Sequence, residues 1–364
     1  MALQRGDRLA VLTSGGDAPG MNAALRAAAR VGAELGFEVL GVEDGYTGLL
    51  DGRLRAMELG ALDEAARCGG TILGTARSKV FPTPEGHARA RAQLVAHKID
   101  GLLVIGGNGS LAGAATLLGA PTAAGGALAV AGVPASIDND LACTSMAIGV
   151  DTAMNTIVEA IDRIYDTASA HRRTFFIEVM GRDCGYLAMT SGIAAGADAV
   201  LVPEVDKSEE DRIAHVVNVI TRAYSDGSAR RRVLVIKAEG AKVDLGRLKS
   251  AVEARIAEDH PDVDTRITVL GHVVRGGSPS AFDRLLAARL ANAAVRALAA
   301  GESGFMAGWV GAGASGAPTV YDPAVLITPI PTVLAETERL MRGDTALAQW
   351  RRRVYREVEP IIAR

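Results

Sequence analysis

The chain has 364 residues, of which 49% are hydrophobic and 22% are charged, as in a soluble globular protein rather than a disordered or fibrous one. Lys and Arg total 39 against 42 Asp and Glu, which gives a net charge of -3, and only 4% of residues are aromatic. The net charge argues against binding to nucleic acid or to an anionic membrane, because basic residues are not in excess. The low aromatic content argues against binding of single-stranded nucleic acid by base stacking. At about 150 residues per domain, the length predicts two domains.

The cysteines and the chain start indicate a cytoplasmic setting. Cys68, Cys143 and Cys184 are scattered and form no C-x-x-C pair, which argues against a disulfide framework and against a thiolate zinc site. The N-terminal sequence MALQRGDRLAVLTSGGD has no long apolar segment after a basic start, and no run of about 18 apolar residues follows elsewhere. We therefore expect a soluble cytoplasmic protein.

Short apolar, β-branched runs alternate along the chain with longer helical patterns. The predicted strands are Arg8–Ser14, Glu38–Val42, Gly101–Ile105, Ala127–Val133, Thr174–Val179, Ala199–Val202, Arg232–Ala238 and Arg266–Leu270. The predicted helices are Met21–Leu35, Ala88–Lys98, Gly109–Leu118, Gly149–Ala170, Gly185–Ala195, Glu209–Tyr224, Leu245–Glu258 and Pro279–Ala300. Continuous apolar runs are typical of strands buried on both faces, so the alternation predicts an α/β sandwich with mostly parallel sheets. Ligands bind such sheets at the carboxyl ends of the strands.

The tail after about Pro331 has a different character. Residues 336–360 are charged and amphipathic, which predicts helix and no catalytic loop. We expect the Arg351–Arg353 run to be a solvated helix face rather than an anion site.

Three glycine-rich loops each join a predicted strand to a helix or lie close to one. They are Ser14–Arg30, Gly69–Ser78 and Val104–Ala114. Glycines let backbone N–H groups approach a phosphate, and a helix N-terminus favours an anion, so the three together favour phosphate binding over simple tight turns. Neither G-x-G-x-x-G nor G-x-x-x-x-G-K-[ST] is present in these loops, which argues against a dinucleotide fingerprint and a Walker loop.

Carboxylates and arginines follow other strands. Asp138 and Asp140 flank Asn139 in the loop that begins with Ser136, and such a pair suits a general base beside a metal-facing carboxylate. The alternative for this loop is an Asx-turn with helix capping.

Two further loops place basic residues where an anionic substrate would bind. Arg182 follows one strand, and His272 and Arg275 follow another. The planar guanidinium group suits phosphate oxygens. Taken alone, Arg77 is more often a surface ion-pair residue and His272 is more often structural, but the position of His272 beside Arg275 and Gly276–Gly277 makes a ligand role equally compatible.

Taken together, these loops resemble the 6-phosphofructokinase family. The motifs TSGGDAPGMNAA, GGT-x-LG-[ST]-AR, IGG-x-GS, IDND, EVMGR-x-CG and LGH-x-x-RGGSP occur in family order from about Arg8 to Asp283, and more weakly to about residue 340. The resemblance implies transfer of the γ-phosphoryl group of MgATP to the 1-hydroxyl of fructose 6-phosphate, a step of glycolysis that yields fructose 1,6-bisphosphate and ADP. It also implies two three-layer α/β domains, an active site in the cleft between them, and a homotetramer or homodimer.

The resemblance assigns domains and catalytic roles. Residues 1–149 and 274–325 would bind the nucleotide, and residues 150–273 and 326–364 would bind the sugar phosphate and carry the tail. It implies that Asp138 is the general base, that Asp140 lies near Mg²⁺ and the sugar, and that Ser136 contacts the transferring group. Arg182 would stabilise charge in the transition state.

The remaining site residues also follow from the resemblance. The sugar phosphate would contact Met180, Gly181, Glu239, His272 and Arg275 of one subunit and Arg173 and Arg266 of a neighbour, in addition to Ser136, Asp138, Asp140 and Arg182. The nucleotide would contact Gly16, Tyr46, Arg77, Gly107, Asn108, Gly109 and Ser110. The metal ligands would be Asn108 and Asp140.

Several positions depart from the family pattern. Asn108 stands where ATP users of the family usually carry Asp, and Ser78 stands where an aromatic residue is common. Pyrophosphate users carry Asp at the position of Gly109 and Lys at the position of Ala135, so these two residues favour ATP. The open alternatives are a pyrophosphate-dependent enzyme, a different ketose phosphate as acceptor, and a catalytically weak regulatory or sugar-phosphate-sensing homologue.

The effector region of the family is only partly matched. Arg26 and Arg30 match phosphate-binding arginines, and Arg230–Arg232 lie where a basic cluster is expected. Tyr165 replaces an effector arginine, so control by ADP or phosphoenolpyruvate does not follow from the resemblance.

Overall fold

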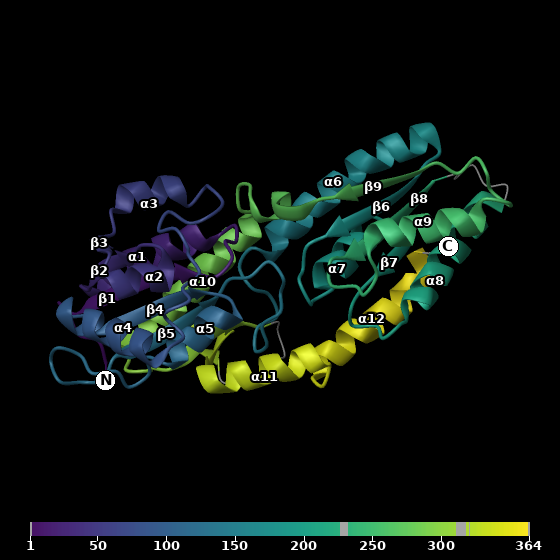
Figure 1. Cartoon of the computed structure of the whole chain (residues 1–364). Helices are drawn as coiled ribbons and strands as arrows, with labels where there is room; N and C mark the ends of the chain where they lie inside the picture. Colours follow the sequence, from purple (N-terminus) through teal and green to yellow (C-terminus); the bar gives the residue numbers. More distant parts are fainter. Residues whose placement is uncertain (1, 226–231, 311–317, 320, 363–364) are drawn as a thin grey trace. The chain divides into compact units, whose positions relative to one another are not determined.

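The computed structural model describes residues 2–225, 232–310, 318–319 and 321–362 (Figure 1). The chain folds into two compact units. The first unit comprises Met1–Thr152 and Arg275–Arg339, and the second comprises Ala153–Val274 and Leu340–Arg364. The first unit continues to Arg339, beyond the boundary at residue 325 that the resemblance implies.

The first unit is built on an eight-stranded sheet with the order β11-β12-β10-β5-β4-β1-β2-β3. The strands are β1 (Arg8–Ser14), β2 (Glu38–Val42), β3 (Leu54–Ala56), β4 (Gly101–Gly106), β5 (Ala129–Pro134), β10 (Phe305–Trp309), β11 (Pro318–Thr319) and β12 (Asp322–Pro329). The central strands pair in parallel, whereas β3, β11 and β12 add antiparallel edges. Strand β4 is buried along its whole length because it lies between β1 and β5 with helices on its faces.

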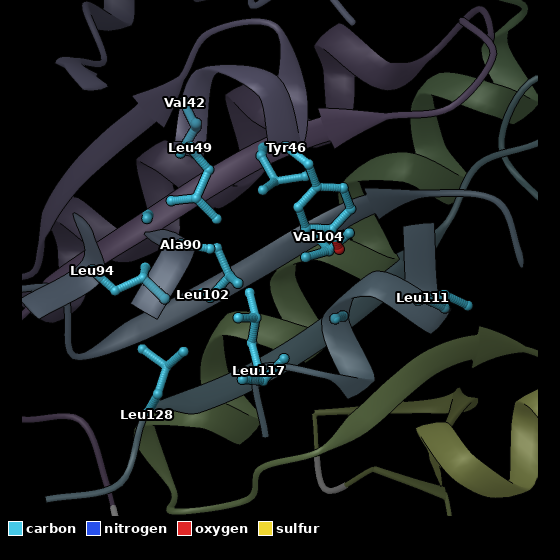
Figure 2. Close-up of a cluster of buried hydrophobic side chains, with 14 of the residues drawn as sticks. Val42, Tyr46, Leu49, Ala90, Leu94, Leu102, Val104, Leu111, Leu117 and Leu128 are labelled. Atoms are coloured by element: carbon cyan, nitrogen blue, oxygen red, sulfur yellow. The ribbon is translucent and has the colours of Figure 1, made fainter. Parts of the chain in front are cut away.

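The helices of the first unit cover this sheet. They are α1 (Met21–Leu35), α2 (Gly45–Asp51), α3 (Leu59–Ala65), α4 (Pro84–Ala96), α5 (Asn108–Ala115), α10 (Ala281–Ala299) and most of α11 (Ile330–Arg342). Helices α1 and α10 pack against each other, and α2 packs against α4. Figure 2 shows how side chains of α2 and α4, such as Leu49 and Leu94, meet Leu102 and Val104 of β4 in one buried cluster. Burial of each such side chain stabilises the fold by about 1.5–3 kcal/mol.

The first unit extends to Arg339 because β12 and α11 complete its sheet and its core. Strand β12 pairs antiparallel with β10, with Ala307 opposite Ile327. The first turn of α11 places Ile330 and Val333, both fully buried, in the same hydrophobic cluster as α2 and α4. These contacts make β12 and the first turn of α11 part of the first unit.

The second unit is built on a four-stranded parallel sheet with the order β7-β8-β6-β9. Its strands are β6 (Thr174–Val179), β7 (Ala199–Leu201), β8 (Val233–Ala238) and β9 (Thr265–Val269). Its helices are α6 (Val150–His171), whose first turn belongs to the first unit, α7 (Tyr186–Ala194), α8 (Glu209–Ser225), α9 (Leu245–Ile256) and α12 (Ala346–Ile362). A short 3₁₀ helix, Gly271–Arg275, follows β9. Helices α8 and α9 bury their apolar faces against β8 and β6.

The α/β fold predicted from the sequence is confirmed. Each predicted strand and helix has a counterpart, and Arg8–Ser14, Met21–Leu35 and Thr174–Val179 agree to the residue. The prediction missed α2, β3 and α3, and also the strands β10 to β12. Helix α2 contains two glycines and is flanked by residues with positive φ, so neither periodicity nor propensity marks it.

The helical tail is present as α11 and α12, but the predicted solvated face is wrong for Arg351. This side chain is only 5% exposed, whereas Arg353 is exposed. Ala348, Arg351 and Tyr355 lie at the i, i+3, i+7 spacing of one helix face and are all buried. No described helix is both long and apolar enough to cross a membrane.

Candidate active site

The loop between β4 and α5 presents two buried polar side-chain atoms. The side-chain amide oxygen of Asn108 and the hydroxyl oxygen of Ser110 are both buried and lack a hydrogen bond within the described residues. Leaving such an atom unpaired costs about 1–3 kcal/mol, so the loop is suited to an outside ligand. A Cβ at Gly109 would meet nothing within 4 Å, so there is open space beside this residue. The N-terminus of α5 adds its positive dipole end, which favours a phosphate.

Glycines make this loop fit the end of β1. A Cβ at Gly106 would lie 2.4 Å from the Ser14 carbonyl oxygen, and a Cβ at Gly15 would lie 3.2 Å from the Ser110 hydroxyl. Gly15 also has φ +92°, which is in the left-handed region that favours glycine. The first and third glycine loops therefore lie side by side, as expected for the carboxyl ends of paired parallel strands.

The loop after β5 carries the candidate catalytic carboxylates. Asp138 is 8% exposed, and the Ser136 hydroxyl donates a hydrogen bond of 2.9 Å to the Asp140 carboxylate. The loop lies against the β4–α5 loop, since the Ala135 N–H bonds to the Gly106 carbonyl oxygen at 3.0 Å. The structure thus brings the predicted carboxylates next to the predicted phosphate-binding loop.

Asn139 closes the carboxylate loop. It is fully buried with φ 50°, a conformation that asparagine tolerates better than most residues. Its side-chain amide donates to the Ser145 carbonyl oxygen at 3.2 Å, and its carbonyl oxygen accepts from the Ala147 N–H at 3.1 Å. These bonds reach six and eight residues along the chain, so Asn139 holds the two ends of the loop together, and neither is the bond of an Asx-turn, which would reach two residues on. The sequence prediction gave this residue no role.

The other predicted nucleotide contacts of the first unit differ in exposure. Arg77 is exposed, and Gly16 lies in the first glycine loop beside Arg275. A guanidinium nitrogen of Arg275 donates to the Asp17 carbonyl oxygen at 3.2 Å. Tyr46 is only 5% exposed and donates its hydroxyl to the Ser110 carbonyl oxygen at 2.6 Å. Tyr46 therefore supports the start of α5 from the core, and burial raises the pKa of its hydroxyl.

In the second unit, the loop after β6 holds Arg182 in an uncommon conformation. Gly181 has φ 150° and Arg182 has φ 54°, while the Cys184 N–H bonds back to the Gly181 carbonyl oxygen at 2.9 Å. A Cβ at Gly240 would lie 2.1 Å from the Arg182 carbonyl oxygen, so this glycine lets two loops meet. Glu239 also lies here, because its N–H bonds to the carbonyl oxygen of Val179 just before Met180. The Arg182 and Glu239 side chains are exposed.

A buried lysine organises the same strand ends. Lys237 is 2% exposed, and its ammonium group donates to the Glu178 carboxylate at 2.8 Å and to the Ala238 carbonyl oxygen at 3.1 Å. It also reaches the Glu239 carbonyl oxygen at 3.4 Å. No motif in the sequence indicated this lysine, because its partners are set by the pairing of β6 with β8.

The two arginines expected to come from a neighbouring subunit share one carboxylate in this chain. Arg173 donates to Asp264 at 2.6 Å, and Arg266 pairs with the other oxygen of Asp264. His272 is exposed on the 3₁₀ helix that follows β9. The structure therefore brings Arg173 and Arg266 together at the β9 edge of the second sheet.

The expected effector arginines also have partners. Arg26 and Arg30 both bind Asp63 at 2.5 Å, and hydrogen bonds from Arg26 and Arg30 lower the pKa of that carboxyl group. The guanidinium of Arg232 lies 3.8 Å from the ring centre of Tyr165. Arg230 and Arg231 lie outside the described residues.

A family model described as phosphofructokinase matches residues 8–298. A Brevibacillus brevis protein named ATP-dependent 6-phosphofructokinase is 47% identical over 304 residues, which are 83% of this chain and 89% of the relative. A Natranaerobius thermophilus protein of the same name is 45% identical over 303 residues, with the same coverage of 83% and 89%.

Solved structures of similar fold include yeast enzymes. Phosphofructokinase from Saccharomyces cerevisiae superposes with a TM-score of 0.80 at 32% identity, covering 98% of this chain and 48% of the yeast chain. This chain thus spans about half of that yeast chain. A pyrophosphate-dependent phosphofructokinase from Marinobacter aquaeolei superposes with a TM-score of 0.74 over 90% of this chain and 83% of that chain, but at 21% identity it shares the fold alone.

Proposed function

The chain belongs to the phosphofructokinase family, and we propose that it transfers the γ-phosphoryl group of ATP to the 1-hydroxyl of fructose 6-phosphate. The products are fructose 1,6-bisphosphate and ADP, and the reaction is a step of glycolysis in the cytoplasm. The observation that carries this proposal is the contact between two loops. One lies at a helix N-terminus and has polar atoms without a partner in the described part of the chain, and the other carries the two aspartates Asp138 and Asp140.

The β4–α5 loop is suited to the nucleotide phosphates. Backbone N–H groups at the start of α5 and the Ser110 hydroxyl would donate to phosphate oxygens. Mg²⁺, when bound, supplies charge neutralisation for the phosphates, and hard oxygen ligands fit it best. The buried Asn108 carbonyl oxygen and the Asp140 carboxylate are oxygen donors from adjacent loops that would hold it.

Asp138 is suited to act as general base. It would accept the proton of the sugar 1-hydroxyl while that oxygen attacks the γ-phosphorus and the bond from that phosphorus to the β–γ bridging oxygen breaks. Its neighbour Asp140 receives a hydrogen bond from Ser136, which holds the second carboxylate in place. Arg182 would stabilise the charge spread over the transferring oxygens. Positioning and electrostatics account for most of the catalysis of such a loose transition state.

The proposed contacts of the sugar phosphate within this chain are Met180, Gly181, Glu239, His272 and Arg275. We propose that Arg173 and Arg266 serve a neighbouring subunit of a homotetramer or homodimer. Asp264 would then be the internal partner that the sugar phosphate replaces on these arginines.

ATP is preferred over pyrophosphate on the evidence of two small residues. Gly109 adjoins open space, and Ala135 is buried and uncharged. An aspartate at position 109 would place a negative charge where the nucleotide's α-phosphate is expected, and like charges repel. The weakly active regulatory homologue is disfavoured because Asp138, Asp140 and Arg182 are all present.

One assay tests this function directly. Purified protein is supplied with fructose 6-phosphate and either ATP or pyrophosphate, and formation of the bisphosphate is followed. We expect ATP to give the faster reaction, and Asp138→Asn to reduce turnover by about 10²–10⁴-fold while sugar phosphate binding is retained. A faster reaction with pyrophosphate would contradict the donor assignment, and an Asp138→Asn variant with more than half of the wild-type rate would contradict the base assignment.

A further inference from the structure

The C-terminal helix α12 is an integral part of the second unit. It packs against α7 and β7. Tyr355 is 6% exposed, and its hydroxyl donates to the Val200 carbonyl oxygen of β7 at 2.6 Å. The match to the family model ends at residue 298, so α12 lies outside the segment matched by that model.

Arg351 extends from this helix to the start of α7. One of its guanidinium nitrogens donates to the Cys184 sulfur at 3.4 Å, and the guanidinium lies 4.7 Å from the ring centre of Tyr186. The side chain is 5% exposed. Burial of a charged group is costly unless it is matched by specific contacts, so this placement is a defined interaction rather than incidental packing.

The residues that Arg351 contacts end the strained loop that carries Arg182. Both Gly181 and Arg182 have positive φ, and such a backbone persists only when surrounding contacts hold it. From one side, the Gly185 N–H is held by the Glu204 carboxylate at 2.7 Å. From α12, Arg351 holds Cys184 and Tyr186 on either side of Gly185.

We propose that Arg351 is a positioning residue, which fixes the 180–185 loop from α12 and thereby orients Arg182 for phosphoryl transfer. This inference rests on the proposed function for its catalytic part only. Arg351 is not among the proposed substrate contacts, and its effect would pass through the loop backbone. Misplacement of a catalytic group by about 1 Å can reduce a rate by about 10²-fold, so a modest loosening of the loop is sufficient.

The test compares Arg351→Met with Arg353→Met. The methionine keeps an apolar stem at position 351 and removes the guanidinium, whereas Arg353 is an exposed residue on the same helix that pairs with Glu357 at 3.7 Å. We expect Arg351→Met to speed amide hydrogen exchange in residues 181–186 by about tenfold or more, since local opening depends on such contacts. The turnover number should fall about tenfold with the KM for ATP within twofold, because the proposed ATP contacts lie in the first unit. Arg353→Met should match the wild type, and Arg351→Lys, which keeps a cation for Tyr186 and a donor for Cys184, should recover part of both readouts.

The two readouts separate the inference from the function on which it rests. Unchanged amide hydrogen exchange in residues 181–186 would show that Arg351 does not hold this loop, whatever the activity. Faster exchange with an unchanged turnover number would show that holding the loop does not position Arg182. A wild-type protein that does not phosphorylate fructose 6-phosphate would refute the proposed function, while the exchange experiment would still show whether Arg351 holds the loop. If Arg351→Met does not fold, Cys184→Ala removes the acceptor and leaves α12 intact, and the same exchange criterion applies.

Discussion

Replacing Asn139 by alanine should destabilise the first unit and misplace both candidate catalytic carboxylates. The native residue is buried, has φ 50°, and supplies one donor and one acceptor to its own loop. Alanine in a left-handed conformation costs about 1–2 kcal/mol. The Ala147 N–H is itself buried, so its loss of a partner adds about 1–3 kcal/mol, whereas Ser145 is exposed and water can satisfy its carbonyl oxygen. We expect a loss of about 2–5 kcal/mol in the free energy of unfolding.

Asn139→Gly provides the matched comparison. Glycine adopts a positive φ at little steric cost but, like alanine, removes both side-chain hydrogen bonds. The loss in free energy of unfolding should therefore be about 1–3 kcal/mol and smaller than the loss for alanine. Turnover should fall in both variants, because Asp138 and Asp140 flank the altered residue.

A tryptophan beside the loop allows the measurement. Trp309 belongs to the first unit, and its carbonyl oxygen accepts from the Ser145 N–H at 2.7 Å. The chain has 2 tryptophans, and Trp350 is 44% exposed, so a Trp350→Phe background leaves one reporter with little disturbance. Urea unfolding followed by Trp309 fluorescence then reports on the first unit. A loss below about 1 kcal/mol for the alanine variant, or a larger loss for glycine than for alanine, would refute the reasoning.

Three further changes test other parts of the chain. Asn108→Asp should lower the Mg²⁺ concentration needed for half-maximal rate, because a carboxylate binds this cation more tightly than an amide oxygen; identical Mg²⁺ titrations of both proteins would leave Asn108 only a turn-forming role. Gly109→Asp should raise the KM for ATP at least about tenfold by charge repulsion, yet leave the melting temperature unchanged or higher, since the position is open and a carboxylate at a helix N-terminus is favourable. Hydrogen bonds from Arg289 lower the pKa of the Asp322 carboxyl group in the folded protein. This ion pair therefore stabilises the fold fully at pH values above the pKa of Asp322 in the unfolded chain, and the stabilisation is lost as the pH falls through the lower pKa of the folded state. Arg289→Met should therefore cost about 1–3 kcal/mol at pH 7 and progressively less below about pH 4, and a pH-independent difference in urea unfolding would argue against the ion pair.

Local patterns in the sequence predicted most of the fold. A continuous apolar run predicts strand β4, and helical periodicity predicts helix α1. Both patterns involve only residues that are close in the sequence. The missed segment from α2 to α3 is held by tertiary contacts instead. Tyr46 of α2, for example, stacks on Phe81 at 3.9 Å between ring centres, a partner far away in sequence.

The candidate site divides in the same way. Glycine loops and the Asp138–Asn139–Asp140 sequence are local signals, and the loops that carry them lie next to each other at the ends of β4 and β5. The burial of Arg351 depends on where α12 packs, which a charge run cannot disclose. Likewise, the sharing of Asp264 by Arg173 and Arg266 depends on the parallel pairing of β6 with β9.

The open space at Gly109 has an evolutionary consequence. Most substitutions near a binding site lower stability, so a change of substrate usually has to await a compensating mutation elsewhere. At position 109 the backbone is not in the left-handed region and no neighbour crowds a new side chain, so the free protein tolerates an acidic residue there. If Gly109 contributes to the choice of phosphoryl donor, the change at this position could be the first step of a lineage from one donor to the other, taken without a poorly folded intermediate. Donor preference would then be a trait that changes readily while the rest of the fold is retained.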